Sequence, residues 1–113
     1  MLGPIADHLE RYMSLLSTRQ KLVAANIANA DTPGYKTLDI EFKAEFQKQM
    51  DPDMHARPEE VTGLEVKNDG NNVNLDREAR LLSENAIRFN IAAQILRSQI
   101  HSVKSAIEEG RNG

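Results

Sequence analysis

The chain has 113 residues, with 14 lysines and arginines against 17 aspartates and glutamates, and it contains no cysteine. This length suits one small domain or a pair of long helices, and the mildly acidic balance argues against non-specific nucleic-acid binding, which needs clustered positive charge. The absence of cysteine excludes disulfides and thiolate metal sites. No stretch approaches the roughly 18 apolar residues of a membrane-spanning helix, and early charged residues interrupt any secretory signal, so export would need a route without a cleavable signal peptide.

A long amphipathic helix is predicted from Pro4 to Ala30. Proline suits the first turn of a helix, where its missing N–H is not needed. Apolar residues then recur every seven positions, the repeat of a left-handed coiled-coil seam. The repeat consists of Leu2, Leu9, Leu16, Val23 and Ala30. At about 1.5 Å per residue, the helix would be about 40 Å long.

The segment 25–36 cannot continue this helix. Pro33 disfavours the α conformation at Thr32, and Pro33-Gly34 suits the centre of a type II turn. Asn26 and Asn29 lie on one helix face, although short amides are poor residues for a helix interior. The segment is therefore either a junction specified by polar contacts or an ordinary helix stop with two exposed amides.

Residues 37–74 differ in character, because they hold most of the acidic side chains and too few apolar ones for an independent core. The proline-bracketed stretch 51–58 is expected to be a mobile loop. Residues 68–71 carry a turn signal, so a short β-hairpin that ends at Val73 is one arrangement of this segment. We expect an irregular projection with at most that small hairpin.

The second long helix is predicted to begin after Asn74, a suitable N-cap, and to end before Gly110. Acidic residues in its first turn favour the helix start. Two heptad series run along it, and together they predict a seam of large and small side chains. They are Leu75, Leu82, Phe89, Leu96 and Val103, and Ala79, Ala86, Ala93, Ile100 and Ile107.

The predicted fold is all-α: two long antiparallel helices form a coiled-coil-like hairpin, because neither helix can bury its apolar stripe alone. The chain would divide into an N-terminal helix and turn (1–36), a variable middle segment (37–74) and a C-terminal helix (75–113). The turn and residues 72–74 would lie near the same end of the helix pair. The predicted intramolecular seam consists of Leu9, Leu16, Val23, Leu82, Phe89, Leu96 and Val103.

A second apolar face lies off this seam on both helices. A helix that is apolar on two sides is normally covered on two sides, and two helices cover only one side of each other. We therefore predict a face between subunits, made of Leu15, Leu22, Ile87, Ile91 and Ile95. The alternative is that residues 38–46 fold back over the three isoleucines.

Catalytic and metal-binding patterns are not found in the sequence. His8, His55 and His101 lack the spacing of metal ligands, and the stretch that starts at Asp69 does not match a calcium loop. No phosphate-binding loop or nucleophile motif is present, so we expect no enzyme, cofactor or metal site. A helix-turn-helix through residues 20–35 is disfavoured, because acidic residues follow where a DNA-reading helix would begin.

Residues 25–36, with the sequence Ala-Asn-Ile-Ala-Asn-Ala-Asp-Thr-Pro-Gly-Tyr-Lys, resemble the N-terminal signature of the bacterial flagellar rod, hook and hook-associated axial proteins. Residues 70–78, followed by Glu84-Asn85 and Arg88-Phe89, are similar to the C-terminal region of the proximal rod proteins, although many of those have tyrosine at the position of Phe89. The middle segment is not matched. By this resemblance the assembly motif is Asn26, Ile27, Asn29, Thr32, Pro33, Gly34 and Tyr35.

The resemblance implies a structural subunit of the flagellar basal-body rod, located in the periplasm and exported by the flagellar type III apparatus. It implies self-association in a helical assembly through the terminal helices. The implied partners are other rod proteins, the rod–MS-ring junction protein FliE and components of the export gate or MS ring, with neither nucleic acid nor membrane insertion. The alternative is a soluble coiled-coil adaptor or secretion-linked chaperone, which would share the helices without forming a filament.

Overall fold

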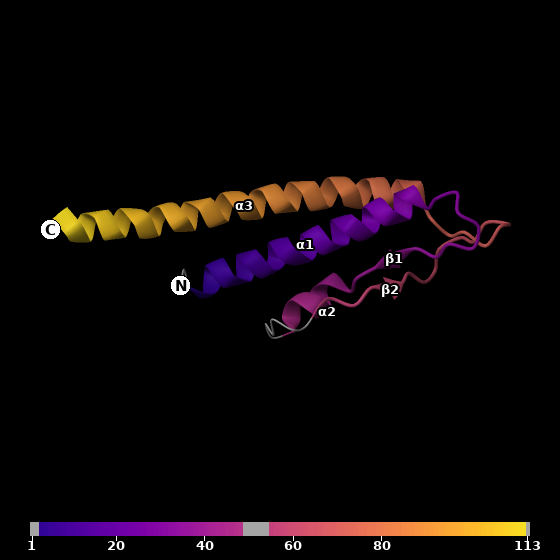
Figure 1. Cartoon of the computed structure of the whole chain (residues 1–113), viewed down its shortest axis with the longest axis horizontal. Helices are drawn as coiled ribbons and strands as arrows, with labels where there is room; N and C mark the ends of the chain where they lie inside the picture. Colours follow the sequence, from indigo (N-terminus) through magenta and orange to yellow (C-terminus); the bar gives the residue numbers. More distant parts are fainter. Residues whose placement is uncertain (1–2, 49–54, 113) are drawn as a thin grey trace.

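The computed structural model describes residues 3–48 and 55–112. Two long helices dominate it, α1 (Pro4–Ala28) and α3 (Leu75–Asn112), and they lie side by side and antiparallel (Figure 1). Between them the chain forms β1 (Leu38–Asp39), the short helix α2 (Phe42–Gln47) and β2 (Glu59–Glu60). The prediction of two long helices with a small projection is confirmed, with a two-stranded sheet added to the helical fold.

The molecule is elongated, with extents of 71 × 26 × 18 Å. Its radius of gyration is 18.6 Å, whereas a compact chain of this length would have a value of about 13 Å. The two long helices are unequal, with 25 residues in α1 and 38 in α3. As a result α3 continues well beyond the N-terminal end of α1 (Figure 1).

Local sequence signals set the helix ends. Pro4 occupies the first turn of α1, and the backbone N–H of Asn29 closes the last turn by donating to Ala25 O and Asn26 O. At the start of α3, Asn74 Oδ1 accepts a hydrogen bond from the N–H of Arg77 at 3.0 Å. Asn74 is therefore the N-cap that the sequence predicts.

The middle segment folds back along α1. β1 and β2 pair antiparallel, with Leu38 opposite Glu60 and Asp39 opposite Glu59. In α2, Phe42 and Phe46 lie edge-on to Tyr12 of α1, with ring centroids 5.4 and 5.8 Å away. Helix α1 is thus packed between α3 and this segment, whereas α3 packs along α1 and, among the described helices and strands, meets β1 only through the Arg77–Asp39 ion pair in its first turn.

The predicted hairpin through Val73 is wrong in its position. A turn does form there, since Gly70 N–H donates to Lys67 O and Lys67 N–H donates to Asn71 O, but it is not flanked by paired strands. The reason is that the backbone of residues 69–72 bonds to the Pro-Gly turn, through Gly34 N–H to Asp69 O and Asn72 N–H to Tyr35 O. The strand pair forms instead between residues 38–39 and 59–60. Residues 51–54 of the predicted loop 51–58 lie outside the described residues.

The face of α3 that contacts α1 differs from the predicted seam. Leu16 and Val23 of α1 are buried and Leu9 is half-buried, but the buried residues along α3 are Glu78, Leu81, Asn85 and Ala92. Of the predicted α3 seam, Leu96 is half-buried, whereas Leu82, Phe89 and Val103 are 40%, 38% and 38% exposed. The predicted position of these three residues is therefore corrected. Leu82 and Phe89 lie beside the inner face of α3, where Asn85 bonds to Gln20, and Val103 lies past the N-terminal end of α1.

The second predicted face is also partly revised. Leu15 is buried within the protomer and Leu22 is half-buried, so Leu15 belongs to the core rather than to an exposed face. Ile87, Ile91 and Ile95 are 60%, 52% and 43% exposed. Residues 38–46 do fold back, but they pack on α1 and leave the three isoleucines open.

Candidate functional site at the helix junction

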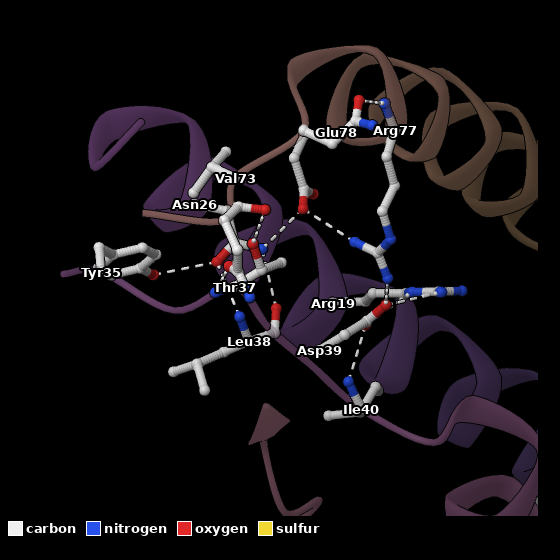
Figure 2. A network of polar contacts seen from close by, with 12 residues as sticks. Arg19, Asn26, Tyr35, Thr37, Leu38, Asp39, Ile40, Val73, Arg77 and Glu78 are labelled. Carbon is white, nitrogen blue, oxygen red and sulfur yellow. Dashed lines mark hydrogen bonds and ion pairs between the residues drawn. The ribbon is translucent and has the colours of Figure 1, made fainter. Parts of the chain in front are cut away.

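Asn26 connects the end of α1 with the two segments that follow it. The residue is almost fully buried, at 1% exposure. Its Nδ2 donates to Leu38 O at 2.8 Å and to Glu78 Oε1 at 3.0 Å, and its Oδ1 accepts from the Leu38 N–H at 3.1 Å and from the Tyr35 hydroxyl at 3.0 Å (Figure 2). The amide thus bonds both backbone groups of Leu38, as a neighbouring strand would do, while it also holds α3.

An ion-pair network lies beside this amide and joins α1, β1 and α3. Arg19 donates to both carboxylate oxygens of Asp39, from Nε at 3.0 Å and from Nη2 at 2.9 Å. Arg77 bridges the two acids, at 2.6 Å from Asp39 Oδ2 and 2.8 Å from Glu78 Oε1 (Figure 2). A planar guanidinium suits such forked contacts.

The two carboxyl groups respond to burial in opposite ways. Burial acts to raise the pKa of Asp39, but hydrogen bonds from Arg19, the Ile40 N–H and Arg77 outweigh it and hold that pKa below its ordinary value. Burial raises the pKa of Glu78 above its ordinary value, and the contacts with Arg77 and Asn26 offset this only in part. Glu78 Oε2 is buried and has no hydrogen-bond partner among the described residues. Glu78 is therefore the acid whose charge the fold accommodates less well.

The Pro-Gly turn is fixed by amide side chains. Asn29 Nδ2 donates to Ala25 O at 2.8 Å, and Asn29 Oδ1 accepts from the Thr32 hydroxyl at 3.0 Å. Asn71, fully buried, donates from Nδ2 to Asn29 O and Thr32 O at 2.9 and 2.8 Å. Gly34 adopts a φ of 75°, which a residue with a side chain rarely takes.

The stretch that precedes α3 completes the junction. Asn72 Oδ1 accepts from the Thr37 N–H at 2.7 Å, and a Cβ on Gly70 would lie 3.4 Å from the Gly34 Cα. Residues 25–39 and 69–78 thus form one interlocked unit. The sequence predicted that the two segments lie at the same end of the helix pair. It did not indicate that Arg19, Asp39, Asn71 and Glu78 take part in the junction. The run of amides in residues 71–74 was the signal that could have indicated a hydrogen-bonded junction.

The predicted assembly residues divide into two groups in the structure. Asn26 is buried, and Asn29 and Tyr35 are half-buried with intramolecular partners. Exposed positions are occupied by Ile27, Thr32, Pro33 and Gly34. The structure therefore brings the seven residues together, but Asn26, Asn29 and Tyr35 are engaged in hydrogen bonds within the protomer.

Two grooves flank the line where α1 meets α3. One, of about 180 Å³, has a mainly apolar lining of Leu9, Tyr12, Arg88, Ile91, Ala92 and Ile95. The other, of about 300 Å³, is lined by Leu16, Ser17, Gln20, Asn85, Ala86, Phe89 and Asn90. The exposed isoleucines and Phe89 thus lie on opposite sides of the α1 contact.

Within the described residues, no helix is long and apolar enough to span a membrane.

These features describe an elongated protein that is built on paired terminal helices and a Pro-Gly junction. The family model of flagella basal body rod proteins matches residues 8–36. A flagellar basal body rod protein FlgB from Buchnera aphidicola is 32% identical over 90% of this chain and 92% of its own length. The FlgB proteins of Yersinia ruckeri and Escherichia coli are 30% and 29% identical, over 87% of this chain and 89% and 88% of theirs.

The chain belongs to the FlgB family of flagellar basal body rod proteins. It is therefore a structural subunit of the rod and not an enzyme.

Proposed function

We propose that the chain is built into the proximal part of the rod through its two long helices, which pack as a coiled-coil-like hairpin within a helical drive shaft. The main support for this proposal is the apolar surface that α3 leaves open on both sides of α1. Ile87, Ile91 and Ile95 lie along one side, and Leu82 and Phe89 along the other. Exposed apolar rows of this length on a small protein are typical of interaction surfaces.

The layering of the molecule indicates which helix contacts neighbours. Helix α1 is covered by α3 on one side and by β1 and α2 on another. Among the described helices and strands, α3 packs against α1 alone, apart from the Arg77–Asp39 ion pair with β1 in its first turn. Neighbouring subunits would thus pack mainly against α3. Because its two open sides differ in sequence, the contacts are heterologous, and repeated heterologous contacts build open helical assemblies rather than closed dimers.

The junction has a supporting role in this proposal. Its buried hydrogen bonds hold the N-terminal axial part (1–36), the projection (37–74) and the C-terminal axial helix (75–113) in one arrangement. The exposed residues Ile27 and 32–34 extend the surface that meets a neighbour. Other rod proteins, FliE and components of the export gate or MS ring are the proposed partners. The periplasm is the proposed location, reached by flagellar type III export without a cleaved signal peptide.

The test replaces Ile91 with a charged residue. Ile91→Asp should leave the helicity and melting temperature nearly unchanged, because the side chain is already 52% exposed. It should lower the amount of protein that co-purifies with flagellar basal bodies by about tenfold or more, since a charge would be buried without a partner at the contact. Arg97→Asp, at an exposed polar position about 120° around the same helix from Ile91, is the matched control and should incorporate normally.

Two results would contradict the proposal. Normal incorporation of Ile91→Asp would show that this face is not an interface, and an equal loss of helicity and incorporation would show that it acts within the protomer. Mass measurement separates the rival function: open-ended growth or co-assembly is expected of a rod subunit, and a small fixed stoichiometry of an adaptor or chaperone.

A further inference from the structure

The C-terminal part of α3 extends beyond α1 and has no partner helix among the residues that the structure describes. Asn26 lies two residues before the end of α1 and contacts Glu78, three residues after the start of α3, so the helices are in register at the junction. The difference in length, 38 − 25 = 13 residues, therefore falls entirely at the far end. Residues 100–112 form this overhang, about 20 Å long, visible as the end of α3 beyond α1 (Figure 1).

The overhang continues the surface on which α1 lies. Val103 follows Asn85 by 18 residues, about five helical turns, so both side chains lie along the same line of the helix. Asn85 is buried against α1, where its Nδ2 donates to Gln20 Oε1 at 2.9 Å, whereas Val103 is 38% exposed. Ile100 and Ile107 flank it at 45% and 56% exposure. The contact surface for a helix thus extends past the end of the helix that occupies it.

A second open surface on the same helix has a similar length. The isoleucine ridge, which we define as Ile87, Ile91 and Ile95, spans about 12 Å along α3, and the apolar side chains of the overhang span about 10 Å. The groove beside the ridge is almost wholly apolar. Both surfaces belong to one continuous helix, so one cannot cover the other within a single chain. Only separate molecules can bring them together.

Building on the proposed function, we infer that the overhang of α3 in one copy packs against the isoleucine ridge of a second copy of this chain. The two surfaces differ, so each copy would donate its overhang to one neighbour and accept the overhang of another. This head-to-tail contact grows without closing unless the rotation between copies returns to the start. The overhang would act as the second helix that the ridge lacks.

Disulfide trapping tests the contact, because the chain has no cysteine of its own. A mixture of Val103→Cys and Ile91→Cys proteins, mildly oxidised, should give a cross-linked pair of the two chains. The matched control is Ser102→Cys with Ile91→Cys: Ser102 is exposed but lies about 100° around the helix from Val103. The yield should be about tenfold lower in the control, because a disulfide requires Cβ atoms about 4 Å apart.

Several outcomes would overturn the inference. Equal cross-linking of each variant with itself would show a symmetric contact, and equal yields with Ser102→Cys would show random collision. Cross-links from Val103→Cys only to a different protein in basal bodies would show that another rod component occupies the overhang. If Ile91→Asp fails to incorporate while Val103→Asp incorporates normally, this inference fails and the proposed function stands. If both incorporate normally, the proposed function fails too.

Discussion

Asn26 satisfies four hydrogen bonds from one short side chain, and no other residue type offers the same groups at that reach. Aspartate could accept from Leu38 and Tyr35, but it could not donate to Leu38 O or Glu78, and it would add a charge beside a buried acid. We predict that Asn26→Ala lowers the free energy of unfolding by about 3 kcal/mol, since buried groups of Leu38 and Glu78 lose their partner. Urea unfolding followed by circular dichroism measures this difference.

Asn29 provides the matched comparison, because it has the same side chain three positions later. Its bonds to Ala25 and Thr32 are local and exposed to solvent, so water can replace them. Asn29→Ala should therefore cost less than about 1 kcal/mol. A similar cost for both variants would contradict the view that the buried amide of Asn26, unlike the exposed amide of Asn29, holds the three segments together.

The two buried acids predict a stability that peaks at mildly acidic pH. The pKa of Glu78 is raised on folding, so its protonation stabilises the fold, and this stability is lost as the pH rises through the folded pKa. The pKa of Asp39 is lowered, so its contribution is present above its unfolded pKa of about 4 and is lost as the pH falls through the folded value. The melting temperature should therefore rise as the pH is lowered from neutral toward the ordinary glutamate pKa of about 4.3, and it should fall as the pH is lowered further, below the ordinary aspartate pKa of about 4.

Two variants assign these changes to their residues. Glu78→Gln should remove the rise toward mildly acidic pH, because glutamine resembles the protonated acid, and Asp39→Asn should reduce the loss at low pH. Thermal melts followed by circular dichroism measure both effects. A Glu78→Gln variant that keeps the wild-type rise would show that other groups cause it.

The sequence predicted which residues of the junction were unusual but not their partners. Asn26 and Asn29 are unusual near the end of a helix, because short amide side chains are poor helix-interior residues. The bonds of Asn26 reach 12 and 52 residues along the chain, and no local pattern indicates such distances. Arg19 and Glu78 have the same appearance in a sequence as ordinary surface charges, so their burial depended on the fold.

At the level of whole elements, the starts of both long helices were predictable, whereas the end of α3 and the facing sides were not. The sequence predicted that the second helix ends before Gly110, but α3 continues to Asn112. Pro4 and Asn74 are local signals that act on the turns in which they lie. The periodicity of α3 gives more than one apolar line, and it cannot tell which line faces α1. The pairing of Gln20 with Asn85 places polar residues on the inner face, so the most apolar line, through Leu82 and Phe89, remains outside.

The overhang predicts uneven protection along α3. Packing against other elements supplies most of the stability of helices in proteins. Residues 100–112 extend past the N-terminal end of α1 and therefore do not pack against that helix. Their amide hydrogens should exchange about tenfold or more faster than those of residues 81–96. Hydrogen exchange on the purified protein at low concentration measures this, and dilution should not alter residues 81–96. Uniform protection along the whole helix would contradict an unsupported overhang.

At the scale of the whole molecule, three layers run side by side, with α3, α1 and the β1–α2 segment in that order (Figure 1). The polar network lies at one end of the helix pair. The open apolar rows lie along α3, which packs against α1 on one side. Under the proposed function, stability and assembly would thus depend on different residues. Charged substitutions on the open rows are expected to change association while leaving the protomer folded.

This separation predicts how association responds to salt and temperature. The open rows consist of isoleucine, leucine and phenylalanine, so burial of apolar surface should supply most of the association free energy. Raising sodium chloride from about 50 to about 500 mM should change the dissociation constant by less than about threefold, because screening acts on charges. Sodium sulfate should strengthen association and cooling should weaken it, since both act on apolar burial. Sedimentation equilibrium measures these constants. A loss of affinity of about tenfold or more in sodium chloride would show that ion pairs, rather than the isoleucine ridge and its neighbours, hold the copies together.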